Sequence, residues 1–478
     1  MSHKRKKTKI VATLGPAISG KKMLLDLVAT GVNVFRINFS HADYKTVEKN
    51  IKNIRAINKE HGYNAAVLAD LQGPKLRIGD MKDNVIVAPG DNIVFATGER
   101  FEGTKDCVFM NYKRFPKDTK AGEKILLDDG KLIFKVVSSN KTDKVKTKVI
   151  QGGHLKSKKG VNLPNTNISQ PALTEKDKKD ALFAIKQEVD WMALSFVRSP
   201  EDVKELEVII SEHSSYKIPI IAKIEKPEAV ANIDAIIKSC DGLMVARGDL
   251  GVEIPAHEVP LIQKELVLKA KSARIPVIIA TQMMESMIDS LTPTRAEVND
   301  VANSVMDGAD AVMLSGETSV GQYPVEVIQK MSDIIKSVEN SELIHVPQKH
   351  PHIKTKRYIT KSICYHAAHM ANQINARGIS TLTNSGYTAF QISGWRPQAH
   401  ILVYSSNRHI IPQLNLLWGV RAFYYDKFVS TDKTLEDVNK MATEKGYLEV
   451  GDMVIGLTAM PMDSNAMVNT LRVTQISA

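Results

Sequence analysis

PIIAKIEKPEAVANIDAIIKSCDGLMVARGD, residues 219–249, contains a unit that recurs along the chain and from which the fold can be predicted. A short apolar run ends at Lys223 and Glu225, a helix-length segment follows, and a second apolar run ends at Arg247 and Asp249. Short runs rich in Val, Ile, Leu and Ala, without strict alternation, are typical of strands buried on both faces of a parallel sheet. The stretch therefore predicts two parallel strands joined by a helix, with charged residues where each strand ends.

The same unit recurs along the chain. Apolar runs lie at 9–16, 34–40, 65–71, 191–196, 219–225, 242–249, 276–282 and 311–317. Helix-length segments separate most of them, and one begins with Ser199 as a predicted N-cap before Pro200. Eight strands alternating with helices predict an α/β fold, a (β/α)8 TIM barrel with its active site where the strands end. The polar residues expected at this mouth are Arg36, Asn38, Ser40, Asp70, Lys223, Glu225, Arg247, Asp249, Thr281, Ser315 and Glu317.

The segment between the third and fourth runs is far too long for an ordinary connection. Its short β-branched runs, separated by turn residues, predict a small β-barrel domain. Gly73-Pro74 and the Pro- and Asn-rich segment 162–173 would be its two hinges, so we expect a lid beside the mouth. Beyond a polar linker at 345–357, alternating helix and strand patterns predict another α/β domain. We expect a first barrel segment (1–72), a β-rich lid (73–170), a second barrel segment (171–344) and a C-terminal α/β effector domain (345–478).

The net charge of +11 is concentrated in the first nine residues and in 141–160. Aromatic residues make up only 6% of the chain, which disfavours a nucleic-acid partner, and we expect anionic metabolites near these basic segments. No apolar run reaches the roughly 18 residues of a membrane span. Three scattered cysteines, Cys107, Cys240 and Cys364, lack metal-site spacing. These features favour a reduced, cytoplasmic protein.

The strand ends suggest a chemistry. Lys223 and Glu225 are two residues apart and share a face, and Asp249 follows a glycine that permits close backbone approach. Two carboxylates from neighbouring strands suit a hard divalent cation. A helix cap remains an alternative for Asp249 and for Ser315, as does a surface ion pair for Glu225. Cations beside carboxylates, without a His or Cys nucleophile, favour phosphoryl transfer.

Seven stretches, spread over nearly the whole chain, resemble signature segments of the pyruvate kinase family. They are TKIVATLGPA, VFRINFSHA, SKKGVNLP, IAKIEKPEAV, DGLMVARGDLG, ATQMMESM and PTRAEVNDVANSVMDGADAVMLSGET. The resemblance implies an allosteric, homotetrameric kinase of glycolysis. Such an enzyme transfers the phosphoryl group of phosphoenolpyruvate to ADP, giving pyruvate and ATP, with Mg²⁺ or Mn²⁺ as cofactor.

The resemblance also implies a role for individual residues. Lys223 would stabilise the transferring phosphoryl group and the developing enolate, and Glu225 and Asp249 would bind the metal. Arg36, Gly248, Asp249 and Thr281 would hold phosphoenolpyruvate, with Thr281 near the proton-donating face. Asn38, Arg77 and the lid residue Lys159 would contact the nucleotide.

The stretch DLQGPKLRIG, residues 70–79, departs from most members of that family. They carry Glu at the position of Lys75, and the K⁺ site there involves positions matching Asn38, Ser40 and Asp70. Lys75 resembles the potassium-independent subgroup, in which an ammonium would stand in place of the monovalent cation. We therefore expect K⁺ not to be required, with Lys75 part of the catalytic site.

The C-terminal domain contains TNSGYTA, residues 383–389, at a predicted strand-to-helix junction. A helix N-terminus can bind phosphate, so Thr383, Asn384, Ser385, Gly386 and Thr388 form a candidate effector site. A plain N-cap by Ser385 is the alternative. The later stretch 461–473 lacks glycine and contains Asp463, which would repel a second phosphate. A sugar monophosphate or AMP is thus the favoured effector, although the enzyme could also have none.

Two other functions fit parts of the pattern. A lyase acting on phosphoenolpyruvate or pyruvate would share the metal carboxylates, but it would not need a nucleotide lid. A catalytically inactive metabolite sensor would signal through the C-terminal domain, but it would not need an intact set of Lys223, Glu225, Asp249 and Thr281.

Overall fold

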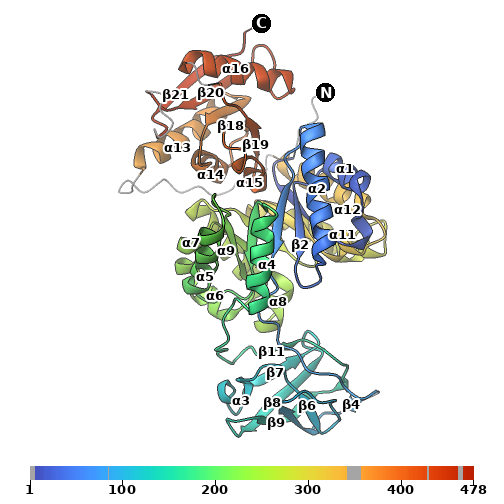
Figure 1. Cartoon of the computed structure of the whole chain (residues 1–478). Helices are drawn as coiled ribbons and strands as arrows, with labels where there is room; N and C mark the ends of the chain where they lie inside the picture. The colour runs from blue at the N-terminus through green and yellow to red at the C-terminus, as the bar shows by residue number, and fades with distance from the viewer. Residues whose placement is uncertain (1–5, 84, 342–356, 428–429, 461–466, 478) are drawn as a thin grey trace.

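The computed structural model describes residues 6–83, 85–341, 357–427, 430–460 and 467–477 (Figure 1). Eight parallel strands close into a barrel in the order β1-β16-β15-β14-β13-β12-β3-β2. Each of the eight apolar runs contains one strand, which confirms the predicted barrel. The strands are β1 (Lys9–Thr13), β2 (Val34–Asn38), β3 (Ala66–Asp70), β12 (Trp191–Leu194), β13 (Ile220–Ile224), β14 (Gly242–Ala246), β15 (Val277–Ala280) and β16 (Ala311–Leu314).

Helices surround the barrel because its strands are apolar on both faces and need covering. Ser199 caps α5 in a capping box with Asp202, as its sequence predicted. The longer helices are α1 (Lys21–Thr30), α2 (Tyr44–His61), α4 (Glu175–Lys186), α5 (Pro200–His213), α7 (Ile233–Ser239), α9 (Val259–Ala273), α10 (Arg295–Asp307) and α12 (Pro324–Glu339). The shorter ones are η1 (Pro16–Ile18), α6 (Pro227–Ala231), α8 (Arg247–Glu253), η2 (Glu285–Ile288) and α11 (Gly316–Ser319). None of the helices in the described ranges has the length and hydropathy of a membrane span.

The segment between β3 and β12 forms a separate β-rich lid at one end of the barrel (Figure 1). Its six-stranded sheet has the order β11-β7-β8-β9-β5-β6, beside the pair β10-β4. Phe95 packs edge-to-face on Phe115 and Phe134 in its own core. Its elements are β4 (Ile86–Val87), β5 (Asn92–Ala96), β6 (Cys107–Phe109), α3 (Phe115–Asp118), β7 (Lys124–Leu127), β8 (Leu132–Ser139), β9 (Lys144–Gln151), β10 (Gly153–His154) and β11 (Val161–Asn162).

The C-terminal α/β domain packs on the opposite end of the barrel from the lid (Figure 1). Its five-stranded sheet has the order β19-β18-β17-β20-β21, with only β21 antiparallel to its neighbour. Its strands are β17 (Gly378–Leu382), β18 (His400–Ser405), β19 (Val420–Tyr424), β20 (Met453–Thr458) and β21 (Thr470–Gln475). Its helices are α13 (Tyr358–Gln373), α14 (Tyr387–Gly394), α15 (Ile410–Gln413), η3 (Leu414–Leu416) and α16 (Thr431–Glu444).

The N-terminal lysines join the barrel to this C-terminal domain. Lys9 Nζ is fully buried and donates to the carbonyl of Val420 at 2.9 Å, and Lys7 Nζ donates to the carbonyl of Pro397 at 3.0 Å. Lys9 begins β1 and therefore lies at the amino end of the barrel, away from the mouth. The expectation that this basic segment lies near an anionic metabolite is wrong for Lys7 and Lys9, because their charges and stems are used in domain packing.

A second buried lysine lies near the same interface. Lys271, in the last turn of α9, is 6% exposed, and its Nζ has no hydrogen-bond partner in the described part of the chain. Burial, and secondarily the nearby Arg396 and Arg274 guanidiniums, lower its pKa from 10.5 to about 7, although Asp310 and Asp307 act in the opposite direction. An unpaired buried cation destabilises a fold.

Lys271→Met should therefore stabilise the protein, because it keeps the packing of the stem and removes the unpaired amine. Near pH 7 we expect the free energy of unfolding to rise by roughly 1–3 kcal/mol. Between pH 7 and 10.5 the amine of Lys271 is protonated more readily in the unfolded chain than in the folded one. The destabilisation caused by Lys271 therefore decreases as the pH rises through this range. The gain from Lys271→Met should thus shrink toward pH 10, as measured by urea unfolding at several pH values.

Lys22→Met provides the matched control, because Lys22 is an exposed lysine of α1. It should leave stability and its pH dependence nearly unchanged. A loss of stability in Lys271→Met at pH 7 would contradict the assignment of Lys271 as a destabilising group.

Candidate active site

A buried ion cluster lies at the carboxyl ends of β2, β3 and β13. Lys223 Nζ lies 3.2 Å from Asp70 Oδ1 and 3.0 Å from Glu225 Oε1. Arg36 Nε donates to Asp70 Oδ2 at 2.6 Å from the neighbouring strand. The alternative of a surface ion pair for Glu225 is wrong, because its side chain is 1% exposed. The barrel thus gathers four charges from three separate parts of the sequence.

Ser195 completes this cluster and was missed by the sequence analysis. Its Oγ accepts a hydrogen bond from Lys223 Nζ at 2.7 Å and donates to the carbonyl of Leu71 at 2.7 Å. Ser195 follows β12 directly, so the rule that polar residues follow the buried strands would have identified it.

Opposite charges favour the charged forms of Lys223 and Asp70, whereas burial acts against that of Glu225. Burial alone would lower the pKa of Lys223, but Asp70 and Glu225 outweigh it and the pKa is raised. Burial would raise the pKa of Asp70, yet Lys223 and Arg36 outweigh it and the pKa is lowered. Burial and the nearby Asp249 raise the pKa of Glu225, with Lys223 acting against them. The site is therefore a fixed charge distribution in a region from which water is largely excluded.

Asp249 approaches this cluster from α8, the short helix that follows β14. It lies in the first turn of α8, whose N-cap is Ala246, so the alternative of a helix cap by Asp249 is wrong. The backbone N–H of Gly248 donates to Thr281 Oγ1 at 2.7 Å. A Cβ on Gly248 would lie 3.3 Å from that oxygen, which explains why glycine suits this position.

Thr281 has an unusual backbone. Its φ is +71°, and that of the following Gln282 is +53°, in the left-handed region that β-branched residues rarely adopt. Such strain persists only where surrounding contacts impose it, and it is common at functional sites. Here the contact with Gly248 fixes the Thr281 hydroxyl beside α8.

Glu225 and Asp249 are the residues whose chemistry fits a divalent cation. Their mutual repulsion contributes to the raised pKa of Glu225, and a cation would relieve it. No group of three or more His, Cys, Asp or Glu side chains suited to a metal occurs among the described residues. Two protein carboxylates would leave the remaining coordination positions to substrate and water, as is usual for Mg²⁺.

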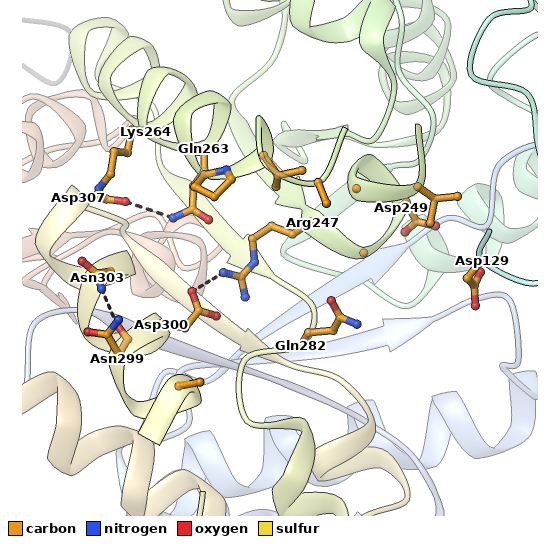
Figure 2. Close-up of a pocket in the computed structure, with 17 residues that line it drawn as sticks. Asp129, Arg247, Asp249, Gln263, Lys264, Gln282, Asn299, Asp300, Asn303 and Asp307 are labelled. Atoms are coloured by element: carbon orange, nitrogen blue, oxygen red, sulfur yellow. Dashed lines mark hydrogen bonds and ion pairs between the residues drawn. The ribbon is translucent and has the colours of Figure 1, made fainter. Parts of the chain in front are cut away.

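Several residues expected at the mouth lie apart from this cluster. Arg247 donates to Asp300 and to the carbonyl of Thr281, and it points toward Asp300 in Figure 2. Glu317 accepts from the backbone N–H groups of Met284 and Ser315 and serves the local loop structure. Both belong to short helices that begin right after the strands, which turns their side chains aside. Ser315 occupies the N-cap position of α11 without a side-chain capping bond.

A cavity of about 830 Å³ extends from the mouth along α9 and α10. Figure 2 shows its lining, which runs from Asp249 and the lid residue Asp129 past Arg247 to Asn299 and Asp307. A smaller cavity of about 80 Å³ lies between the lid and the barrel. Asp249 and Asp129 line both cavities, so the lid and the Asp249 carboxylate face a common space.

Lys75 and the predicted nucleotide-binding residues Asn38, Arg77 and Lys159 lie outside the central cluster. Lys75 is exposed, lines the smaller cavity and makes no ion pair with a described carboxylate. Arg77 donates to the carbonyl of Lys158 at 2.7 Å, and Lys159 pairs with Asp128 at 2.8 Å within the lid. Asn38 ends β2 beside Asp70, with its Oδ1 accepting from the N–H of Ser40. Of these four residues Lys75 lines the smaller cavity, and none of them pairs with Lys223 or Glu225 in the described part of the chain.

The predicted effector segment forms the turn between β17 and α14. Gly386, at φ +79°, is the N-cap of α14, and its N–H donates to Thr383 Oγ1 at 3.0 Å. The alternative of an N-cap by Ser385 is therefore wrong. Asn384 and Ser385 are exposed, whereas the Thr388 hydroxyl accepts from Thr381 within the domain.

Comparison with known proteins agrees with this architecture over almost the entire chain. The family profile "Pyruvate kinase, barrel domain" matches residues 5–328, and "Pyruvate kinase, alpha/beta domain" matches residues 361–474. Pyruvate kinase from Corynebacterium efficiens is 42% identical to this chain, over 98% of this chain's length and 97% of its own length. Pyruvate kinase from Geobacillus stearothermophilus is 41% identical, over 99% of this chain's length and 81% of its own length. A crystal structure of a pyruvate kinase from Cryptosporidium parvum superposes with a TM-score of 0.91 at 33% identity, covering 98% and 96% of the two chains. The chain, with its barrel, lid and C-terminal α/β domain, belongs to the pyruvate kinase family, whose members transfer a phosphoryl group from phosphoenolpyruvate to ADP.

Proposed function

We propose that phosphoryl transfer takes place at the Lys223 cluster. The observation that supports this most strongly is the buried ammonium of Lys223, held between Asp70 and Glu225 with Arg36 beside it. In the reaction the bond from phosphorus to the enol oxygen breaks, and a bond forms from phosphorus to a terminal oxygen of ADP. Lys223 and Arg36 would neutralise the phosphoryl oxygens and the developing enolate oxygen.

Protonation at carbon then converts the enolate to pyruvate. Thr281 is well placed to orient this proton, directly or through a water, because its hydroxyl is fixed against Gly248. The N–H of Asp249, in the first turn of α8, favours a substrate carboxylate, whereas the N–H of Gly248 is already used by Thr281. Glu225 and Asp249 would hold Mg²⁺ or Mn²⁺, which supplies positive charge to the phosphoryl oxygens when bound.

Removing the ammonium in Lys223→Met should reduce kcat by roughly 10²–10³ or more, because fixed charge stabilises the transition state. Pyruvate formation from phosphoenolpyruvate and ADP with Mg²⁺ measures this loss. Lys271→Met removes another buried lysine far from the mouth and should retain activity. A folded Lys223→Met enzyme within tenfold of the wild type would refute the role of Lys223 and favour another centre for the chemistry.

We further propose that Lys75 replaces the monovalent cation, so that K⁺ is not required. Lys75 lines the cavity between lid and barrel and has no carboxylate partner among the described residues, so its charge is available to substrates. Asp70, which the resemblance connects with K⁺, already accepts Arg36 and contacts Lys223. A monovalent cation at Asp70 would meet two positive side chains, those of Arg36 and Lys223.

The wild type should be equally active in Na⁺ and K⁺ buffers, whereas Lys75→Glu should lose activity in Na⁺ and regain much of it in K⁺. The reason is that the carboxylate of the introduced Glu would need a monovalent cation beside it, whereas the ammonium of Lys75 does not. Steady-state rates in paired buffers measure this difference. Lys146→Glu makes the same charge change on an exposed strand of the lid and should show no cation dependence. A wild-type enzyme active only in K⁺ would refute the proposal.

The remaining assignments concern organisation and regulation. We propose domain limits of 1–72, 73–170, 171–344 and 345–478. We also propose that the protein is a cytoplasmic homotetramer. The lid would close over ADP and bring the nucleotide together with Asn38, Arg77 and Lys159. The turn at Thr383, Asn384, Ser385, Gly386 and Thr388 would bind a monophosphorylated effector, because Asn384 and Ser385 are exposed before the N-terminus of α14. We expected Asp463 to repel a second phosphate, but this residue lies outside the described residues.

Isothermal titration should give heat with AMP or a sugar monophosphate, and the heat should disappear in Ser385→Glu, whose carboxylate would repel the phosphate. Ser272→Glu, an exposed serine on α9, provides the control. Heat from fructose 1,6-bisphosphate alone would show that the preference for a single phosphate is wrong.

A further inference from the structure

A buried carboxylate lies beneath the joint between the lid and the barrel. Glu253 Oε1 accepts from Lys226 Nζ at 2.5 Å and from Asn162 Nδ2 at 2.9 Å. The Glu253 side chain is 1% exposed and that of Lys226 is 8% exposed. Asn162 ends β11 in the lid, whereas Lys226 and Glu253 belong to the barrel. One oxygen atom therefore joins the two domains.

The other carboxylate oxygen of Glu253 has no donor of its own within the described ranges, so the stability of the buried carboxylate depends on the two donors to Oε1. Glu253 Oε2 is buried and has no hydrogen-bond partner in the described part of the chain. A buried carboxylate depends on hydrogen bonds to offset the loss of hydration. Among the described residues, Lys226 and Asn162 are the two side-chain donors to Glu253, so withdrawal of Asn162 removes one of them.

The same pair connects the residues proposed to hold the divalent cation. Lys226 directly follows Glu225, and Glu253 lies one helical turn after Asp249 on α8. The ion pair therefore ties the end of β13 to α8, the two places that carry Glu225 and Asp249. A change in the length or direction of this pair would be transmitted over only a few bonds to both carboxylates.

The first hinge reaches the same region. The backbone N–H of Phe196 donates to Glu225 Oε2 at 2.8 Å, and Lys226 Nζ lies 5.9 Å from the centre of the Phe196 ring. A Cβ on Gly73, at that hinge, would lie 2.8 Å from the ring. Both chain segments that connect the lid to the barrel thus contact groups that hold Glu225 or Asp249.

We propose that Glu253 is a positioning residue that couples the position of the lid to the geometry of the cation site, with Asn162 as the contact on the lid. The proposal rests on the function proposed above for Glu225 and Asp249. When the lid brings Asn162 onto Glu253, the Lys226–Glu253 pair and α8 are held in the arrangement that suits the cation. By reciprocity, a bound cation favours the lid position in which Asn162 contacts Glu253.

Direct Mn²⁺ binding to the full-length chain tests this coupling without substrates. Titration followed by the electron paramagnetic resonance of free Mn²⁺ would compare wild type, Asn162→Ala, Glu253→Gln, the double variant and Asn92→Ala. Asn162→Ala should weaken Mn²⁺ binding about fivefold, at the low end of typical coupling between sites. Glu253→Gln should weaken it further, and the double variant should equal Glu253→Gln, because Asn162 acts through Glu253.

Asn92→Ala removes an exposed asparagine elsewhere in the lid and should bind Mn²⁺ like the wild type. Small-angle scattering gives the reciprocal readout: Mn²⁺ should change the radius of gyration of the wild type but not that of Asn162→Ala. If Glu253→Gln does not fold, the comparison of Asn162→Ala with Asn92→Ala decides alone.

The possible failures can be told apart. Equal Mn²⁺ affinity in wild type and Asn162→Ala would overturn the coupling and leave the cation site standing. Additive effects of the two substitutions would also overturn it, because Asn162 would then act by another route. No Mn²⁺ binding by the wild type would overturn the proposed cation site together with the coupling.

Discussion

The contact of Lys223 with Asp70 and Glu225 is the interaction on which the rest of the site depends. A buried charge without a partner is unstable, and each of these three groups is buried. Asp70 lies far from Lys223 and Glu225 in the sequence, so folding must bring it to them. Only a closed parallel barrel brings the ends of β3 and β13 to one mouth, so the charge cluster and the barrel require each other.

This constraint also explains the placement of the other two domains. Charged groups at the mouth interact strongly only if water is excluded from them. The lid is attached at that end of the barrel, where it can exclude water. The amino end of the barrel is closed by the C-terminal domain, through the buried Lys9 and the Arg396–Asp310 ion pair. The proposed substrate and effector sites therefore lie at opposite ends of the strands, and any communication between them would pass through the barrel.

The barrel was predictable because a strand buried on both faces leaves a strong pattern, and the central residues Arg36, Asp70, Lys223 and Glu225 follow from the strand ends. The failures have physical causes. Arg247 and Glu317 lie in helices that start right after the strand, and the sequence pattern does not show this early turn. The packing role of Lys9 depends on Val420, a residue more than four hundred positions away. Asn162 and Glu253 resemble ordinary polar residues until the fold joins them.

Glu253 shows how the two carboxylates proposed to hold the cation could be supported by a third. Glu225 and Asp249 repel each other, so without a cation the mouth would tend to separate them. The Lys226–Glu253 pair opposes this separation because it joins the end of β13 to α8, outside the cluster of Lys223, Asp70 and Arg36. Because its strength depends in part on a hydrogen bond from the lid, the cation site is best arranged when the lid is in place. A kinase that must avoid transferring its phosphoryl group to water gains from such an arrangement, since the charges that promote transfer are then fully aligned only when the site is covered.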